Sequence, residues 1–187
     1  MPYLTVRDID IYFDRAGAGP PLLAISGSGS DLRLKPSLLE SPLAKSFDVL
    51  SYDQRGLGRT SKPNEVYSMA DYAEDAAALL DAVGWKRVPV VGVSFGGMVA
   101  LELVLRHPDR VGKLALCSTS PGGEGGSSYP LHSLQNLSAH ERARVMASIS
   151  DTRRDAGWAA DNPGELGELI RKFSDDPFAK EPGHQRE

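Results

Sequence analysis

The segment Val88–Leu105 reads V-P-V-V-G-V-S-F-G-G-M-V-A-L-E-L-V-L, an apolar run in which one serine stands between glycines. Val88–Val93 is typical of a buried strand, and Gly96–His107 is typical of a helix. A G-x-S-x-G between a buried strand and a helix is the pattern of a nucleophile elbow, a tight turn that exposes the serine hydroxyl. The pattern predicts that Ser94 lies at the carboxyl end of the strand, beside the helix N-terminus.

Such a turn needs small residues two positions before and after the serine, because larger side chains would collide with the neighbouring strand and helix. Gly92 and Gly96 meet this need, and Gly97 allows still closer packing. The helix N-terminus favours a developing negative charge. The alternative is a tight glycine turn in which the Ser94 hydroxyl only caps the helix. The strand and helix around the motif favour the nucleophile.

Other glycine-rich sites do not fit the spacing. In Gly92–Gly97 a serine occupies the second position of G-x-G-x-x-G, and a phosphate loop would need lysine where Met98 stands. Gly27–Leu32 lacks the third glycine. The formal net charge of −4 gives no electrostatic support for a nucleic-acid partner. The sequence thus argues against nucleotide and nucleic-acid binding.

The hydrophobic pattern predicts six strands and alternating helices. Strands followed by helices, after a leading hairpin, indicate an α/β fold with a mostly parallel sheet. The expected strands are Tyr3–Val6, Ile9–Phe13, Leu22–Ser26, Phe47–Tyr52, Val88–Val93 and Lys113–Ser118. The expected helices are Leu38–Lys45, Met69–Val83 and Gly96–His107, the second with Ser68 as N-cap, Asp71 in its first turn and Gly84 as its stop.

The chain changes character after Ser118. Residues 1–120 are expected to form the α/β core, and residues 121–187 a linker followed by a partial helical lid. The linker, S-P-G-G-E-G-G-S-S-Y-P, is flexible by composition. Beyond it, Ser138–Phe173 is polar with a helical pattern, and no further strand is expected.

The chain has the character of a cytoplasmic protein. The single Cys117 excludes an intrachain disulfide, and acidic residues come too early for a signal peptide. Ser94 and Glu102 interrupt the longest apolar run, which therefore reads as a buried strand and helix and not as a membrane span. No membrane partner is expected.

A nucleophilic serine also needs donors for the oxyanion that forms on its substrate. One is normally the N–H of the next residue, here Phe95, and the other comes from the loop after the third strand. That loop reads I-S-G-S-G-S from Ile25, and its glycines allow a close backbone approach, so we expect Ser28 N–H as the second donor. Its alternative is a plain turn without a ligand. One such donor contributes about 2.7–4 kcal/mol to transition-state stabilisation.

Four segments, spread over about residues 3–120, resemble the α/β-hydrolase fold family, especially its small esterases, enol-lactonases and cofactor-free haloperoxidase-like members. They are L-L-A-I-S-G-S-G, Y-D-Q-R-G-L-G-R-T-S, V-V-G-V-S-F-G-G-M-V-A and L-R-H-P-D-R-V-G-K-L-A-L. The resemblance implies a serine hydrolase of small carboxylic esters or lactones, without metal or organic cofactor. It leaves open carbon–carbon bond hydrolysis or perhydrolysis on the same nucleophile.

The chain departs from the family pattern at Ser26, where many relatives carry histidine before the oxyanion glycine. That histidine is not the catalytic one. In such relatives D-Q-R-G-L-G is a structural turn, which implies backbone-capping and ion-pairing roles for Asp53 and Arg55.

The serine lacks a clear base. The family order is serine, acid, histidine, with the acid usually after a seventh strand and the histidine after an eighth. His107 closes a helix and is expected to be structural, while His132 and His140 lie in the lid-like segment and His184 in the polar tail. After the sixth strand, where some relatives place the acid, no carboxylate comes before Glu124.

Two explanations fit the lack of triad partners. The chain is an N-terminal portion of a longer hydrolase, truncated at its C-terminus, or it is a shortened protein that no longer catalyses and serves as a binding module. The length favours the first. Truncation would remove the seventh strand that flanks the sixth in the family and leave an open apolar edge, which predicts poor solubility or self-association through Leu114–Cys117.

Overall fold

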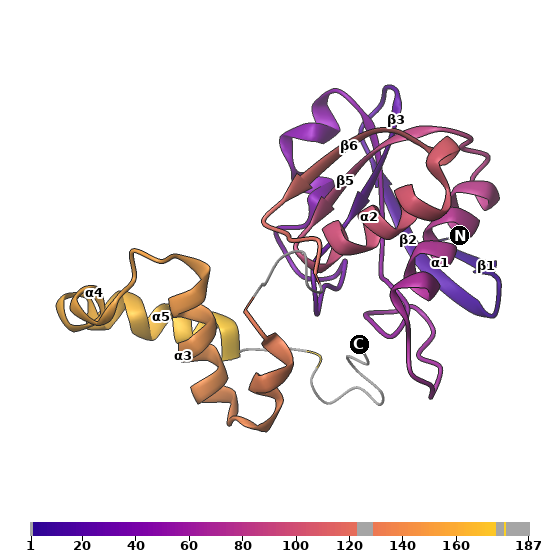
Figure 1. Cartoon of the computed structure of the whole chain (residues 1–187). Coiled ribbons are helices and arrows are strands. Elements are labelled where there is room, and N and C mark those ends of the chain that lie inside the picture. The colour runs from indigo at the N-terminus through magenta and orange to yellow at the C-terminus, as the bar shows by residue number, and fades with distance from the viewer. Residues whose placement is uncertain (1, 123–128, 175–177, 179–187) are drawn as a thin grey trace. The chain divides into compact units, whose positions relative to one another are not determined.

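A computed structural model describes residues 2–122, 129–174 and 178 (Figure 1). These residues fall into two compact units: residues 2–122 belong to the first unit, and residues 129–174 and 178 belong to the second. The assignment of residues 121–187 as linker and partial lid stays a prediction. None of the helices in the described ranges is both long and apolar enough to span a bilayer.

The described part of the first unit is built on a six-stranded sheet in the order β1-β2-β4-β3-β5-β6. The first two strands form an antiparallel hairpin, β2 pairs antiparallel with β4, and the remaining pairs are parallel. The predicted α/β fold with a leading hairpin is confirmed. The strands are Tyr3–Val6, Ile9–Ala16, Pro21–Ile25, Asp48–Tyr52, Val88–Val93 and Val111–Cys117, β1 to β6 in chain order.

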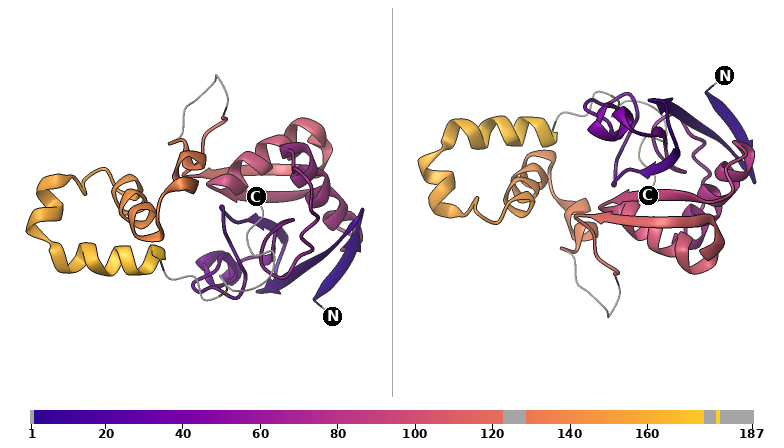
Figure 2. Two further views of the ribbon diagram at one scale, coloured as in Figure 1. Left: turned by 90° about the horizontal axis from the view of Figure 1, so that it is seen from below. Right: turned by 90° about the horizontal axis from the view of Figure 1, so that it is seen from above.

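Two helices, α1 (Met69–Ala82) and α2 (Phe95–Arg106), cover one face of the sheet. The Ser68 hydroxyl accepts the Asp71 N–H, and the Asp71 carboxylate accepts the Ser68 N–H, so both ends of this capping box are made. Gly84 follows the C-cap with φ of 74°, as a helix stop requires. Figure 2 shows α1 and α2 on the side of the sheet opposite the segment that joins β3 to β4.

That joining segment corrects one prediction. The helix expected at Leu38–Lys45 is two short 3-10 helices, η1 (Leu38–Glu40) and η2 (Pro42–Lys45). Ser41 ends the first, and Pro42, which has no N–H to donate, begins the second. The segment still supplies apolar side chains, including the buried Leu32 and Leu39, to a second core over β2, β3 and β4.

Strand β6 is the least covered element of the sheet. Apart from Val111 all of its residues are exposed, and no described strand pairs with its outer edge. Its register with β5 places Leu114 beside Val90 and Leu116 beside Gly92, on the α2 side of the sheet, yet these leucines are 36% and 42% exposed. A 3-10 turn, η3 (Pro108–Arg110), leads into the strand, which begins two residues earlier than expected.

The second unit is helical, and its polar segment is broken into three separate helices, as the sequence indicates. These are α3 (Ala139–Ser150), α4 (Ala156–Asp161) and α5 (Pro163–Ser174), preceded by η5 (Leu131–Asn136). Asp155 caps α4 through the Trp158 N–H, and Pro163 occupies the first position of α5, where a missing N–H costs nothing. Few of its described side chains are buried; they are Leu134, Ala143, Ala147 and Ile170.

Candidate active site

Ser94 stands between β5 and α2 with φ of 53° and ψ of −121°. A non-glycine residue at positive φ is uncommon, and such strain persists only where the surroundings enforce it. Val88–Val93 is extended and α2 begins at Phe95, as the nucleophile-elbow interpretation of the segment requires. The chain therefore reverses sharply at this one residue.

The glycines around Ser94 are required by their neighbours. A Cβ on Gly92 would lie 2.5 Å from Gly96 O, and a Cβ on Gly96 would lie 2.3 Å from Ile25 O. Both distances are far below van der Waals contact with backbone atoms, which cannot give way as a flexible side chain can. The expected need for small residues two positions on either side of the serine is confirmed.

The Ser94 hydroxyl does not cap the helix that follows it. Ser94 occupies the N-cap position of α2, but its side chain accepts no capping hydrogen bond. Within the described residues the hydroxyl has no hydrogen-bond partner at all, and the residue is half-buried. The alternative interpretation, a serine that only caps its helix, does not describe this geometry.

The loop after β3 lies directly against Ser94. A Cβ on Gly27 would be 3.2 Å from Ser94 Cβ and 3.7 Å from its Oγ. Ser30 N–H donates to Gly27 O at 3.3 Å, closing a turn in which Gly29 has φ of 65°. Within the described part of the chain, neither the Ser28 amide nor the Phe95 amide donates a hydrogen bond. Two unpaired N–H groups thus lie in the residues that adjoin Gly27 and Ser94.

Gln54 holds the start of this loop, a role that the sequence did not indicate. Its side chain is fully buried, and its Nε2 donates to Ser26 O at 2.9 Å. The signal was weak, because Gln54 lies within D-Q-R-G-L-G and that segment was interpreted only as a structural turn. A long amide side chain directly after a buried strand is the feature that could have drawn attention to it.

Asp53 is structural, as expected. Its carboxylate accepts the Leu32 N–H at 2.7 Å and the Arg59 N–H at 2.9 Å, so it fixes two loops at the end of β4. Burial raises the pKa of this carboxyl from 3.8 to about 6, and the two backbone N–H groups only partly oppose that rise.

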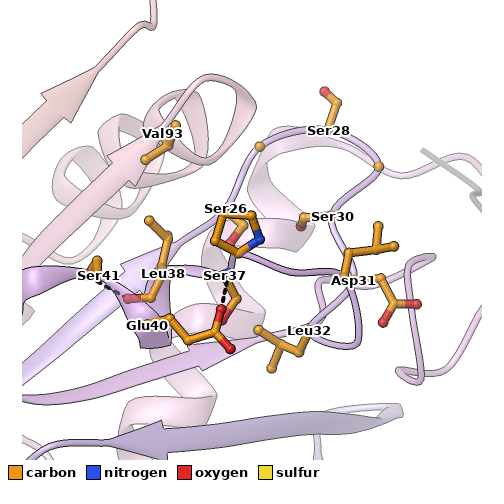
Figure 3. A pocket seen from close by; sticks show the side chains of 14 residues that line it. Ser26, Ser28, Ser30, Asp31, Leu32, Ser37, Leu38, Glu40, Ser41 and Val93 are labelled. Carbon is orange, nitrogen blue, oxygen red and sulfur yellow. Dashed lines mark hydrogen bonds between the residues drawn. The ribbon is translucent and has the colours of Figure 1, made fainter. Parts of the chain in front are cut away.

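An open pocket of about 560 Å³ borders the elbow (Figure 3). Val93 of β5 forms one wall, and the loop with Ser26, Ser28 and Ser30 forms another. Apolar side chains and two carboxylates complete it: Leu32, Leu34, Pro36, Leu38, Asp31 and Glu40. Gly27 and Val93, which line the pocket, are neighbours of Ser94, but Ser94 itself is not among the lining residues. The pocket offers hydroxyl groups and apolar surface together.

In the described part of the first unit, no histidine completes a triad with Ser94. His107 is the C-cap of α2, and its Nε2 lies 3.1 Å from Glu74 Oε1, in agreement with a structural role. His140 lies on α3 in the second unit, the side chain of His132 is not described, and His184 lies outside the described residues together with Glu124. Among the described side chains, no group of three or more His, Cys, Asp or Glu could hold a metal ion.

A family profile described as alpha/beta hydrolase fold matches residues 20–149, well over half of the chain. The chain belongs to the alpha/beta hydrolase fold family. The match includes both the elbow and the loop at Gly27, so the two parts of the site lie inside the region that defines the family.

Known hydrolases resemble this member of the family in sequence and structure. A protein of Azorhizobium caulinodans that is named as a proposed carbamate hydrolase, RutD, is 35% identical over 116 residues. The match covers 62% of this chain and 43% of RutD. The 2-hydroxymuconate semialdehyde hydrolase of Pseudomonas sp. strain CF600 is 37% identical over 119 residues, 62% of this chain and 40% of that enzyme. The enol-lactonase of Burkholderia xenovorans LB400 superposes with a TM-score of 0.67 at 25% identity, covering 92% of this chain and 67% of the lactonase.

The chain spans less than half the length of the two curated relatives. Their hydrolase class supports the prediction that this alpha/beta hydrolase is an enzyme. The assignment of Ser94, Ser28 and Phe95 to chemical roles stays a prediction.

Proposed function

We propose that this chain carries the nucleophile and the oxyanion hole of a serine hydrolase that acts on small carboxylic esters or lactones. The observation that carries the proposal is the unpartnered Ser94 hydroxyl on a strained turn, next to two amides without acceptors. In water-poor surroundings, such fixed donors stabilise a developing oxyanion without further reorganisation.

The reaction follows from these groups. Ser94 Oγ attacks the carbonyl carbon and loses its proton to a general base, and the carbonyl oxygen becomes an oxyanion held by the Phe95 and Ser28 N–H groups. Collapse of this intermediate breaks the ester bond, and the base returns the proton to the departing alkoxide. Water then attacks the acyl-serine in the same way and releases the carboxylic acid.

We place the base and its orienting acid, a histidine and an aspartate, outside the described residues. In those residues no imidazole or carboxylate hydrogen-bonds to the Ser94 hydroxyl. Serine at neutral pH is a poor nucleophile without such a base, so the proposal requires one. The likeness to an enol-lactonase and the mixed lining of the pocket support a lactone or small ester as substrate.

A second candidate is hydrolysis of a carbon–carbon bond by the same serine. The 37% identity to a 2-hydroxymuconate semialdehyde hydrolase favours it. Incubation with a small ester, a lactone and a vinylogous diketone, followed by product analysis, separates the two. Carboxylic acid from the ester or lactone alone supports the first candidate, and cleavage of the diketone supports the second.

A fluorophosphonate probe tests the nucleophile directly. The full chain is incubated with the probe, digested and mapped by mass spectrometry, with Ser94→Ala and Ser120→Ala as paired variants. We expect label on the peptide that contains Ser94, retained in Ser120→Ala and lost in Ser94→Ala. Absence of label at Ser94 in a folded protein that includes the segment with the base would instead support the binding-module alternative.

A further inference from the structure

The backbone carbonyl of Ser94 accepts two hydrogen bonds. One comes from Gly97 N–H at 2.9 Å, within the first turn of α2. The other comes from the Thr119 hydroxyl at 2.6 Å, from a segment 25 residues further along the chain. The second bond has a normal length for a hydroxyl donor to a carbonyl. The elbow thus has a contact with the segment that follows β6.

The last residue of β6 binds the other polar group of the Ser94 backbone. Ser94 N–H donates to Cys117 O at 2.9 Å, so Cys117 and Thr119 hold the amide and the carbonyl of one residue. Between them, Ser118 has φ of 49°, an uncommon conformation for a residue other than glycine. This conformation turns the chain at the end of β6 and aims the Thr119 side chain at the elbow.

Packing fixes the Thr119 side chain in this position. A Cβ on Gly97 would lie 2.5 Å from Thr119 Cγ2 and 2.6 Å from both its Cβ and its Oγ1. Thr119 therefore fills the space that the absent side chain of Gly97 leaves free. The sequence predicted that Gly97 allows close packing, and the structure identifies Thr119 as the neighbour that uses it.

The carbonyl of Ser94 and the amide of Phe95 belong to one planar peptide group, in which they point in opposite directions. We infer that Thr119 is a positioning residue, which fixes this peptide plane and so aims the Phe95 N–H at the place where an oxyanion forms. The inference rests on the proposed function only for the role of that N–H. The strained turn at Ser94 needs such external restraint, since its own conformation is unfavourable.

Two matched comparisons isolate the effect of the Thr119 hydroxyl. Thr119→Val keeps the shape against Gly97 and removes the donor, and it is compared with the wild type. Thr119→Ser and Thr119→Ala both lack the methyl group and differ only in the hydroxyl, so they remain informative if Thr119→Val does not fold. Thr152→Val, at an exposed position of the second unit, is the control for a loss of hydroxyl elsewhere.

Amide hydrogen exchange at Ser94 and Gly97, whose N–H groups donate to Cys117 O and Ser94 O, reports the peptide plane without any need for activity. We expect exchange about fivefold faster in Thr119→Val than in the wild type, and in Thr119→Ala than in Thr119→Ser, the effect of losing one hydrogen bond. Fluorophosphonate labelling of Ser94 should slow by a similar factor. A residue that only stabilised the fold would lower the unfolding temperature and leave both rates unchanged in the folded protein.

The outcomes separate the two proposals. Faster exchange without labelling of the wild type supports the positioning role and counts against the hydrolase. Labelling of the wild type that is equally fast in Thr119→Val supports the hydrolase and overturns the positioning role. Exchange that is unchanged in both hydroxyl-free variants also overturns it.

Discussion

Arg55 and Asp75 form a buried bidentate salt bridge in the first unit. Arg55 Nε lies 2.7 Å from Asp75 Oδ2, Arg55 Nη2 lies 2.9 Å from Asp75 Oδ1, and both side chains are 1% exposed. The guanidinium also contacts Asp8 at 3.0 Å and Glu65 at 3.1 Å. The turn after β4 is thereby tied to α1 and to the leading hairpin, which confirms the ion-pairing role expected for Arg55.

Replacing Arg55 by methionine should destabilise the fold by about 3–5 kcal/mol, because it leaves the buried Asp75 carboxylate without its main partner. The double variant Arg55→Met with Asp75→Leu should be more stable than Arg55→Met alone, since no buried charge is left. Urea unfolding measures both. As a control, Arg153→Met breaks an ion pair with Asp151 in which the arginine side chain is 87% exposed, and should cost at most about 1 kcal/mol. Equal losses in the two arginine variants would contradict the prediction.

Asp53 should make stability fall as pH rises from about 4 to 6. Its pKa in the folded chain is about 6 and its usual value is 3.8, so the folded state binds the proton more tightly than the unfolded state does. Its contribution is fully present below the lower value and is lost as pH rises through the upper one. The difference corresponds to about 3 kcal/mol. Unfolding free energies of the wild type and Asp53→Asn at pH 4, 5, 6 and 7 test this, and a constant difference between the two would refute it.

Gly96→Ala should disrupt the elbow. The added Cβ would meet Ile25 O at 2.3 Å and Ser26 O at 2.4 Å, so the strand and the loop must both move, at a cost of about 1–3 kcal/mol or more. Gly167→Ala in α5 is the matched control, because nothing lies within 4 Å of its added Cβ, and alanine favours a helix by about 0.5–1 kcal/mol. Thermal unfolding and labelling of Ser94 should both respond to the first variant, and neither should decline with the second.

The features that could be predicted from the sequence are those determined by residues close together in the chain. The apolar run before Ser94, the glycine spacing and the N-cap at Ser68 each depend on residues near one another, and each prediction was confirmed. The fold class, a mostly parallel sheet after a leading hairpin, followed from the alternation of strands and helices, whereas the order of the strands in the sheet was not predicted. The split of Leu38–Lys45 into two short turns was missed because its apolar residues mask the effect of Ser41 and Pro42 on the backbone.

The contacts that complete the candidate site could not be predicted from the sequence. Gln54 meets Ser26, and Thr119 meets Ser94, only because β3, β4, β5 and β6 bring their carboxyl ends to one edge of the sheet. Neither pair has a spacing that a local pattern reveals. The general base stays unassigned, since the histidine described in the first unit, His107, pairs with Glu74 and not with Ser94.

We propose that the open edge of β6 makes the chain self-associate. Leu114 and Leu116 are partly exposed there, and unpaired strand edges recruit further strands. Leu116→Lys should raise the proportion of monomer measured by light scattering over a concentration series. Leu105→Lys is the control. Leu105 lies on α2 and is 77% exposed, so this variant adds the same charge away from the edge of β6. A wild type that stays a monodisperse monomer at high concentration would count against the proposal.

The two edge strands of the described sheet, β1 and β6, differ in length. β1 spans four residues and β6 spans seven, so β1 offers a partner far fewer backbone groups than β6 does. If two copies paired through their β6 strands about a twofold axis, both β6 edges would be used. Only the short β1 edge of each copy would then remain open. Growth of such an assembly would close at a dimer, and fibrils would not be its natural end point.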